Sequence, residues 1–127
     1  MGQSQTWFMY ARDKNDRWCD EPLYNTIIQA DNINHHMGRF KHRVYEYALG
    51  ELDIGKLYLY QGWSRLIKCY IDEDTFKIQF KTKEAKLAWE SCRRSQKGKV
   101  FDTQFTPIAI KDDWVLYFKR NTRVLSD

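Results

Sequence analysis

The chain has 127 residues, of which 43% are hydrophobic, 16% aromatic and 30% charged, and its formal net charge is +4 at pH 7. These globular values fit one compact domain over residues 1–127 and leave too little chain for two ordinary cores. Three cysteines without a Cys-x-x-Cys pair argue against a disulfide framework and a structural zinc site.

The first half of the chain predicts a strand followed by a helix. Residues 6–12 have strand composition and end in a polar, turn-like cluster. Residues 33–49 are predicted to form a helix, with Asp31 or Asn32 as the cap and Gly50 at the end. The apolar stripe of this helix consists of Ile33, Met37, Phe40, Val44, Tyr47 and Ala48.

The second half predicts a sheet interrupted by a second helix. The predicted strands are 57–60, 65–71, 76–81, 100–105 and 114–119. A hairpin connection is expected at 72–75, and a helix at 82–94. In the third strand, Lys77, Gln79 and Lys81 alternate with apolar residues, which predicts one apolar and one cationic sheet face. We therefore expect an α+β fold, a single domain with a largely antiparallel sheet and about two helices packed on one face.

Residues 77–99 concentrate the positive charge of the chain. They contain eight basic and two acidic residues, so this segment carries +6 and the remainder is slightly acidic. Basic side chains in such a cluster can follow phosphates, with an affinity that falls steeply with salt. The candidate binding cations are Lys77, Lys81, Lys86, Arg93, Arg94, Lys97 and Lys99. The alternative is a solvated helix face on which Glu90 pairs with basic neighbours at helical spacing.

Aromatic residues in the β-rich segments extend this hypothesis. The candidates for stacking on bases are Tyr58, Tyr60, Trp63 and Tyr70. For each ring taken singly, burial in the core is the competing interpretation. Aromatic residues support a binding site only where their rings are exposed.

Two patterns have the residue types of nucleases. His35, Arg39, His42 and Glu46 share the polar face of the first predicted helix, as in a metal-independent ribonuclease. The two histidines are two turns apart, about 10.5 Å, which is too far for one metal ion. A second acidic-plus-lysine set resembles a metal-dependent site, but its members are expected on a hairpin tip and a helix start. This set is Asp72, Glu73, Asp74, Glu84 and Lys86. We expect no catalytic residues, metal or cofactor.

The sequence favours a small non-enzymatic binding module that engages nucleic acid or another polyanion through a basic, aromatic-flanked surface. The alternative is a protein–protein interaction module, such as a small inhibitor or accessory subunit of a larger enzyme, because Tyr, Trp and Arg also anchor protein interfaces. A ribonuclease is the third candidate. With no basic-then-apolar leader and no run of about 18 apolar residues, we expect a cytoplasmic protein without membrane partners. Partner identity, strand preference and oligomeric state stay open.

Overall fold

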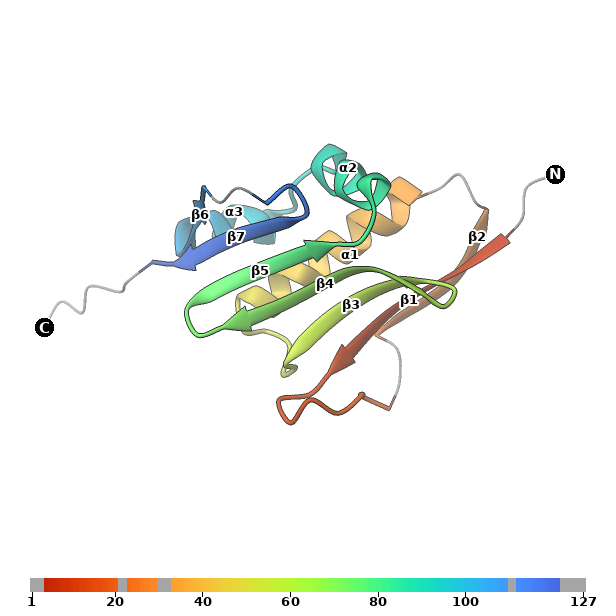
Figure 1. Ribbon diagram of the computed structural model, residues 1–127, viewed down its shortest axis with the longest axis horizontal. Coiled ribbons are helices and arrows are strands. Elements are labelled where there is room, and N and C mark those ends of the chain that lie inside the picture. Colours follow the sequence, from red (N-terminus) through yellow and green to blue (C-terminus); the bar gives the residue numbers. More distant parts are fainter. Residues whose placement is uncertain (1–3, 21–22, 30–32, 110–111, 122–127) are drawn as a thin grey trace, which may run out of the picture.

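A computed structural model shows an antiparallel sheet with helices packed on one of its faces (Figure 1). The structure describes residues 4–20, 23–29, 33–109 and 112–121. The seven strands lie in the order β2-β1-β3-β4-β5-β7-β6. Their bounds are β1 Ser4–Arg12, β2 Tyr24–Gln29, β3 Lys56–Gln61, β4 Ser64–Asp72, β5 Thr75–Phe80, β6 Phe105–Ile108 and β7 Val115–Arg120. The helices of the described part are α1 Ile33–Ala48, α2 Lys83–Ser91 and α3 Gln96–Gln104.

Two tight hairpins set the register at the centre of the sheet. The β3–β4 connection is Gly62-Trp63, in which Gly62 has a φ of 59° that glycine adopts without steric cost. The β4–β5 connection lies between Asp72 and Thr75, at the predicted place, and Glu73 there has a φ of 57°. A register shift between Leu59 and Tyr60 is the only irregularity in the β3–β4 ladder. Apart from this shift, where the consecutive residues Leu66 and Ile67 of β4 are both buried, the paired strands present alternate side chains to opposite faces of the sheet.

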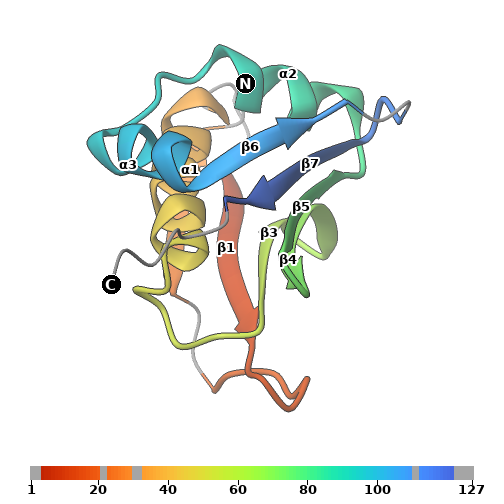
Figure 2. The same cartoon turned by 90° about the vertical axis from the view of Figure 1, so that its left-hand side faces the viewer.

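The core lies between the sheet and the helices, which occupy the same side of it (Figure 2). Helix α1 forms because its apolar residues recur at helical spacing, and its predicted stripe is buried from Met37 to Ala48. The side chain of Ile33 and the cap candidates Asp31 and Asn32 lie outside the described residues. Aromatic rings fill much of the remaining space. The fully buried Phe76 ring contacts Tyr47, Phe101, Phe105 and Phe118.

Lys41, a buried residue of helix α1, forms hydrogen bonds to the C-terminal end of helix α2. The Lys41 ammonium donates hydrogen bonds to the backbone carbonyl oxygens of Trp89 at 2.7 Å and Cys92 at 3.0 Å. These carbonyls belong to the last turn of α2, where the helix itself provides no donors. Burial lowers the pKa of Lys41, and the two hydrogen bonds offset part of that desolvation. At its other end, α2 begins at the predicted cap, since the Thr82 hydroxyl accepts from the amide of Ala85.

The α+β class, the antiparallel sheet and the helices on one face confirm the sequence prediction, with three helices in the described residues rather than about two. The predicted strand at 100–105 is wrong, because this segment belongs to helix α3 and strand β6 begins only at Phe105. The helix predicted over 82–94 is shorter and ends at Ser91. Ser95 then caps α3, since its hydroxyl accepts from the amide of Gly98. Strand β2 was not predicted.

Glycines in the first and third helices have contrasting surroundings. A Cβ added at Gly98 of α3 would lie 2.8 Å from Cε2 of Tyr45, closer than real Cβ contacts, and would also meet the Arg94 side chain. Gly98 is thus required by the close packing of α3 against α1. A Cβ added at Gly38 of α1 would have no heavy atom within 4 Å. Among the described helices, none is long and apolar enough to cross a membrane.

Candidate nucleic-acid interface

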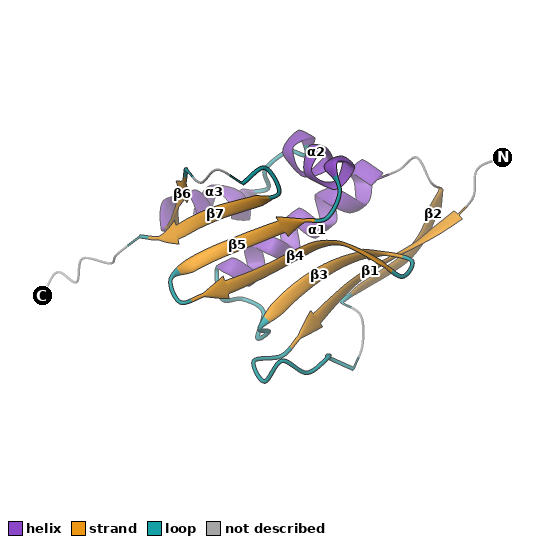
Figure 3. Ribbon diagram, viewed as in Figure 1, coloured by secondary structure: helices purple, strands orange, loops and turns teal. Residues whose placement is uncertain are grey.

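The face of the sheet opposite the helices is called the open face here, because no described helix packs on it (Figures 2 and 3). Strand register places its side chains in rows across the strands. The first row is Arg12, Lys56, Tyr70, Lys77 and Tyr117. The second row is Tyr10, Tyr58, Lys68 and Gln79. The third row is Phe8, Tyr60 and Arg65. Aromatic side chains therefore gather on β1 and β3, and cations border them on β3, β4 and β5.

A cluster of rings covers the part of the open face formed by β1 and β3. Trp18, from the segment after β1, returns to the sheet and lies with its ring centroid 5.1 Å from that of Tyr58. It also contacts Tyr10 and Tyr60, and the Arg12 guanidinium lies 4.0 Å from its centroid. Tyr58 is only 5% exposed, whereas Trp18 is 46% exposed. Trp18 is therefore the accessible ring at this place, and Tyr58 supports it.

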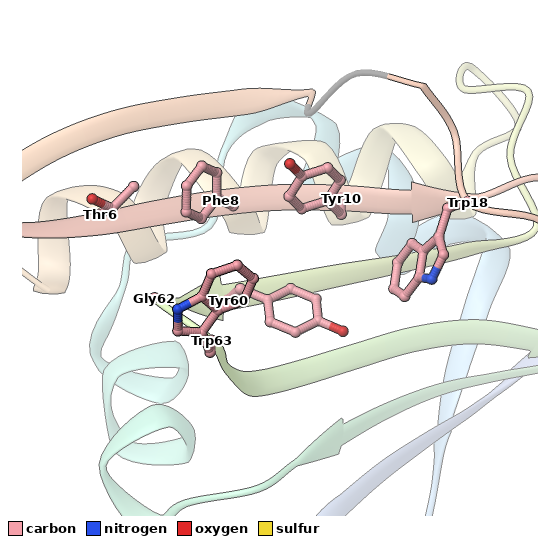
Figure 4. A pocket seen from close by; sticks show the side chains of 7 residues that line it. All are labelled: Thr6, Phe8, Tyr10, Trp18, Tyr60, Gly62 and Trp63. Atoms are coloured by element: carbon pink, nitrogen blue, oxygen red, sulfur yellow. The ribbon is translucent and has the colours of Figure 1, made fainter.

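Beside this cluster lies a groove of about 520 Å³ (Figure 4). Its lining residues are Thr6, Phe8, Tyr10, Trp18, Tyr60, Gly62 and Trp63. Trp18 lies at one end, and Trp63, on the β3–β4 hairpin, lies toward the other. The Trp63 ring is fully exposed. A tyrosine hydroxyl carries its proton at neutral pH, and burial raises the pKa of Tyr60 further, so this hydroxyl can donate a hydrogen bond. The groove thus combines flat apolar walls with a few polar groups.

Two cations next to the groove form no ion pair with any described residue. These are Arg65 and Lys68, both on β4. Burial lowers the pKa of Lys68, and the positive charges of Lys56 and Arg65 lower it further. Mutual repulsion of this kind is relieved when an anion binds. Arg65 and Lys68 are therefore suited to bind a phosphate or another anionic group.

Acidic residues neutralise part of the same face. Asp16 accepts a hydrogen bond from Lys56 at 2.8 Å, and this bond is the main reason that the pKa of Asp16 is lowered. Asp72 pairs with Lys77 at 3.2 Å and raises the pKa of that lysine. Lys77 also lies over the rings of Tyr70 and Tyr117. Among the cations of β3, β4 and β5, the unneutralised charge is thus on β4, and the exposed Lys119 of β7 is a further open-face cation without an ion pair to any described residue.

The seven cations predicted from the sequence do not form one surface. Lys77 is on the open face, together with the predicted rings Tyr58, Tyr60, Trp63 and Tyr70. Lys81 directly follows β5 and is exposed. The other five belong to the helical layer, namely Lys86, Arg93, Arg94, Lys97 and Lys99. The basic segment 77–99 begins in strand β5 and continues into helices α2 and α3. Its cations are therefore divided between the sheet and the helical layer.

Internal contacts occupy three of the cations in the helical layer. Lys86 donates to the carbonyl oxygen of Asp113 and lies 4.0 Å from Glu90, the partner that the sequence suggested. Arg94 pairs with Asp102 at 2.8 Å. Lys97 contacts Glu51 and lies 3.6 Å from Glu46. These side chains stabilise the helical layer, whereas Arg93 and Lys99 are exposed and form no ion pair with any described residue.

The nuclease patterns do not converge in the structure. His42 lies 3.7 Å from Glu46 on the exposed side of α1, and the His35 side chain is outside the described residues. His36, which the sequence did not single out, is fully buried and stacks on Trp7 at 5.4 Å. Within the described residues, no group of three or more His, Cys, Asp and Glu side chains is arranged to hold a metal ion. Asp72–Asp74 form the β4–β5 hairpin and Glu84 is in the first turn of α2, as expected.

More than half of the residues that make the open face were not predicted from the sequence. These are Phe8, Tyr10, Arg12, Trp18, Lys56, Arg65, Lys68 and Tyr117. The signal for most of them is strand alternation, which on β1 makes Phe8 and Tyr10 point away from the buried Met9. Trp18 has no such signal. Comparison of the chain with models of known protein families, with curated proteins and with solved structures finds no match.

Proposed function

We propose that the protein is a non-enzymatic module that binds single-stranded nucleic acid on its open face. The observation that carries this proposal is the pairing register, which sets the partly exposed rings of β1 and β3 beside the unneutralised cations Arg65 and Lys68 of β4. Proteins that bind single strands combine these two elements, a cationic surface that follows the phosphates and rings on which bases stack.

The energetics favour a single strand over a duplex. Stacking of one base on an exposed ring contributes about 1–3 kcal/mol, and this term is available only where the base faces are not already stacked on each other. Trp18 and Trp63 offer exposed rings for it. A duplex would contact only the cations, because its bases are not available for stacking on the rings. The few unneutralised charges on the open face would by themselves give only modest affinity. We therefore infer a preference for unpaired strands.

One observation favours a second candidate, a protein-interaction module. The groove is lined mainly by aromatic rings, and exposed Trp with neighbouring Arg is typical of the residues that dominate protein interfaces. A protein partner bound mainly through these rings would respond weakly to salt, whereas phosphate contacts give a steep response. Salt dependence therefore separates the two candidates.

The cysteines bear on the proposed cytoplasmic setting. None of the three forms a disulfide with a described residue, and Cys69 is fully buried, so that burial raises its pKa far above the usual value. A buried thiol of this kind is unreactive and serves as a small apolar core residue. Three cysteines without a disulfide among the described residues fit a reducing compartment, where disulfides are rare.

The five tryptophans provide built-in reporters for the test. In a ¹H–¹⁵N spectrum, addition of a short single-stranded oligonucleotide at low salt should shift the indole signals of Trp18 and Trp63. The signal of Trp89, which is buried between α1, α2 and β5, should not move and serves as the internal control. A duplex of the same sequence should give smaller shifts at equal concentration. Absence of any shift with the single strand, or shifts confined to signals of the helical layer, would refute the proposed interface.

A further inference from the structure

We propose that the groove beside Trp63 is a subsite for one unpaired nucleobase, whose phosphate lies on Arg65. This inference rests on the proposed function and deepens it, because it assigns the base and the phosphate to separate residues. The floor of the subsite is the pair Phe8 and Tyr60, which face each other across β1 and β3. The Trp63 indole forms the wall on the hairpin side.

The two ends of the groove differ in the state of their indoles. Trp18 is already packed, because Tyr10, Tyr58 and Tyr60 contact its ring and Arg12 lies over it. Trp63 contacts no other aromatic ring of the described residues and is fully exposed. A large apolar ring that lines a groove and is fully exposed to water is typical of a binding site. The vacant stacking position is therefore at the Trp63 end.

The dimensions and polar groups of the groove suit a base. Its volume of about 520 Å³ lies within the range of small-ligand sites, about 300–1,000 Å³. Its walls are flat rings, which match the two faces of a base. The hydroxyl groups of Thr6 and Tyr60 can meet the polar edge of the base, and Tyr60 keeps its proton at neutral pH.

Charge complementarity points to a nucleotide rather than to a proline-rich or aromatic peptide. Arg65 is paired in register with Tyr60, so it lies one strand spacing, about 4.8 Å, from the groove floor. It forms no ion pair with a described residue, and Lys68 on the same strand adds a second positive charge. A nucleotide combines a flat base, which fits the groove, with a phosphate that can lie on Arg65. A proline-rich segment would leave both cations without a counterion.

The test uses a short oligothymidylate with one central 2-aminopurine, whose fluorescence is quenched when it stacks on an indole. Binding to the wild-type protein should quench this signal. Trp63→Ala should abolish the quenching and weaken binding about 5- to 140-fold, because one stacked base is lost. Trp63→Phe should restore most of the affinity. Trp114→Ala is the matched control, since it removes an exposed indole that does not line the groove and should change neither readout.

The outcomes separate this inference from the proposed function. If the oligonucleotide binds the wild-type protein and Trp63→Ala with equal affinity and quenching, the subsite is refuted while nucleic-acid binding stands. If an oligonucleotide with an abasic site at the central position binds as tightly as the intact one, the subsite is likewise refuted. If no oligonucleotide binds at low salt but a proline-rich peptide changes the Trp63 fluorescence, both proposals fail and the groove is a peptide site. Circular dichroism of each variant checks the fold, which a fully exposed side chain should not affect.

Discussion

Neutralising the two free cations of β4 should reduce the salt dependence of nucleic-acid binding by a calculable amount. The variant is Arg65→Gln with Lys68→Gln. Among the cations of β3, β4 and β5 on the open face, Lys56 and Lys77 are already paired with acidic residues, whereas these two are not. They are therefore the side chains expected to release counterions from the strand.

The magnitude follows from the number of phosphates that these cations meet. For single strands, each neutralised phosphate contributes about 0.7 to the slope of log K against log salt, so loss of two contacts should reduce the slope by about 1.4. Between about 50 and 200 mM salt, this difference corresponds to about a sevenfold smaller loss of affinity in the variant than in the wild type. At low salt the variant should bind more weakly, and the two affinities should converge as salt increases.

The assay is fluorescence anisotropy with a labelled single strand at several salt concentrations. The matched control is Arg93→Gln with Lys99→Gln, which removes the same charge from exposed positions of the helical layer. Its slope should equal that of the wild type, apart from the small effect of net charge. Equal slopes for the two double variants would contradict the assignment of phosphate contacts to the open face.

Four further predictions each concern a single residue. Asp16→Asn should strengthen binding at low salt, because it frees Lys56 from its ion pair, and an unchanged or weaker affinity in a titration would contradict this. The pKa of Lys68 lies below its usual 10.5, and an anion binds only the protonated ammonium, so affinity should fall as pH rises through that lowered pKa. Lys68→Arg should keep its affinity over the same alkaline range, and identical pH profiles would refute the role of this lysine. In chemical denaturation, Gly38→Ala should raise the free energy of unfolding by about 0.5–1 kcal/mol. Gly98→Ala should lower it by about 1 kcal/mol or more, and a stabilised Gly98→Ala variant would show that the crowding there is relieved at no cost.

The elements that could be predicted from the sequence are those in which apolar residues recur with a regular helical or strand period, because this period determines which side chains are buried. Helix α1 was identified because its apolar stripe is long, and strand β5 because Phe76, Ile78 and Phe80 alternate with polar residues. Helix α3 was misassigned because only Gly98 and Phe101 are buried on it, so helical periodicity is weak, and its Val100 and Phe101 favour strands. Tertiary packing of Phe101 against Tyr45 and Phe105 overrides that preference.

The candidate site could be predicted only in part, for a related reason. Tyr60 and Trp63 can be predicted as candidate stacking residues because they are aromatic residues in a β-rich segment. Lys77 can be predicted as a binding cation because it alternates with apolar residues in a predicted strand. Arg65 and Lys68 become neighbours of the groove only when β4 pairs with β3, and a register shift at Tyr60 decides which residue faces it. Trp18 reaches the same face by a return of the chain after β1. Such long-range placements depend on the three-dimensional pairing of segments and leave no periodic signal in the sequence.

Single-strand binding on the open face is tested most directly by the affinity of the wild-type protein for a labelled single-stranded oligonucleotide, compared with a duplex of the same length, at low and at physiological salt. We expect micromolar or tighter binding of the single strand at low salt, weaker binding of the duplex, and a marked loss of affinity as salt increases. Failure to bind the single strand at low salt would contradict the proposed function. Binding that prefers the duplex would contradict the role assigned to the exposed rings.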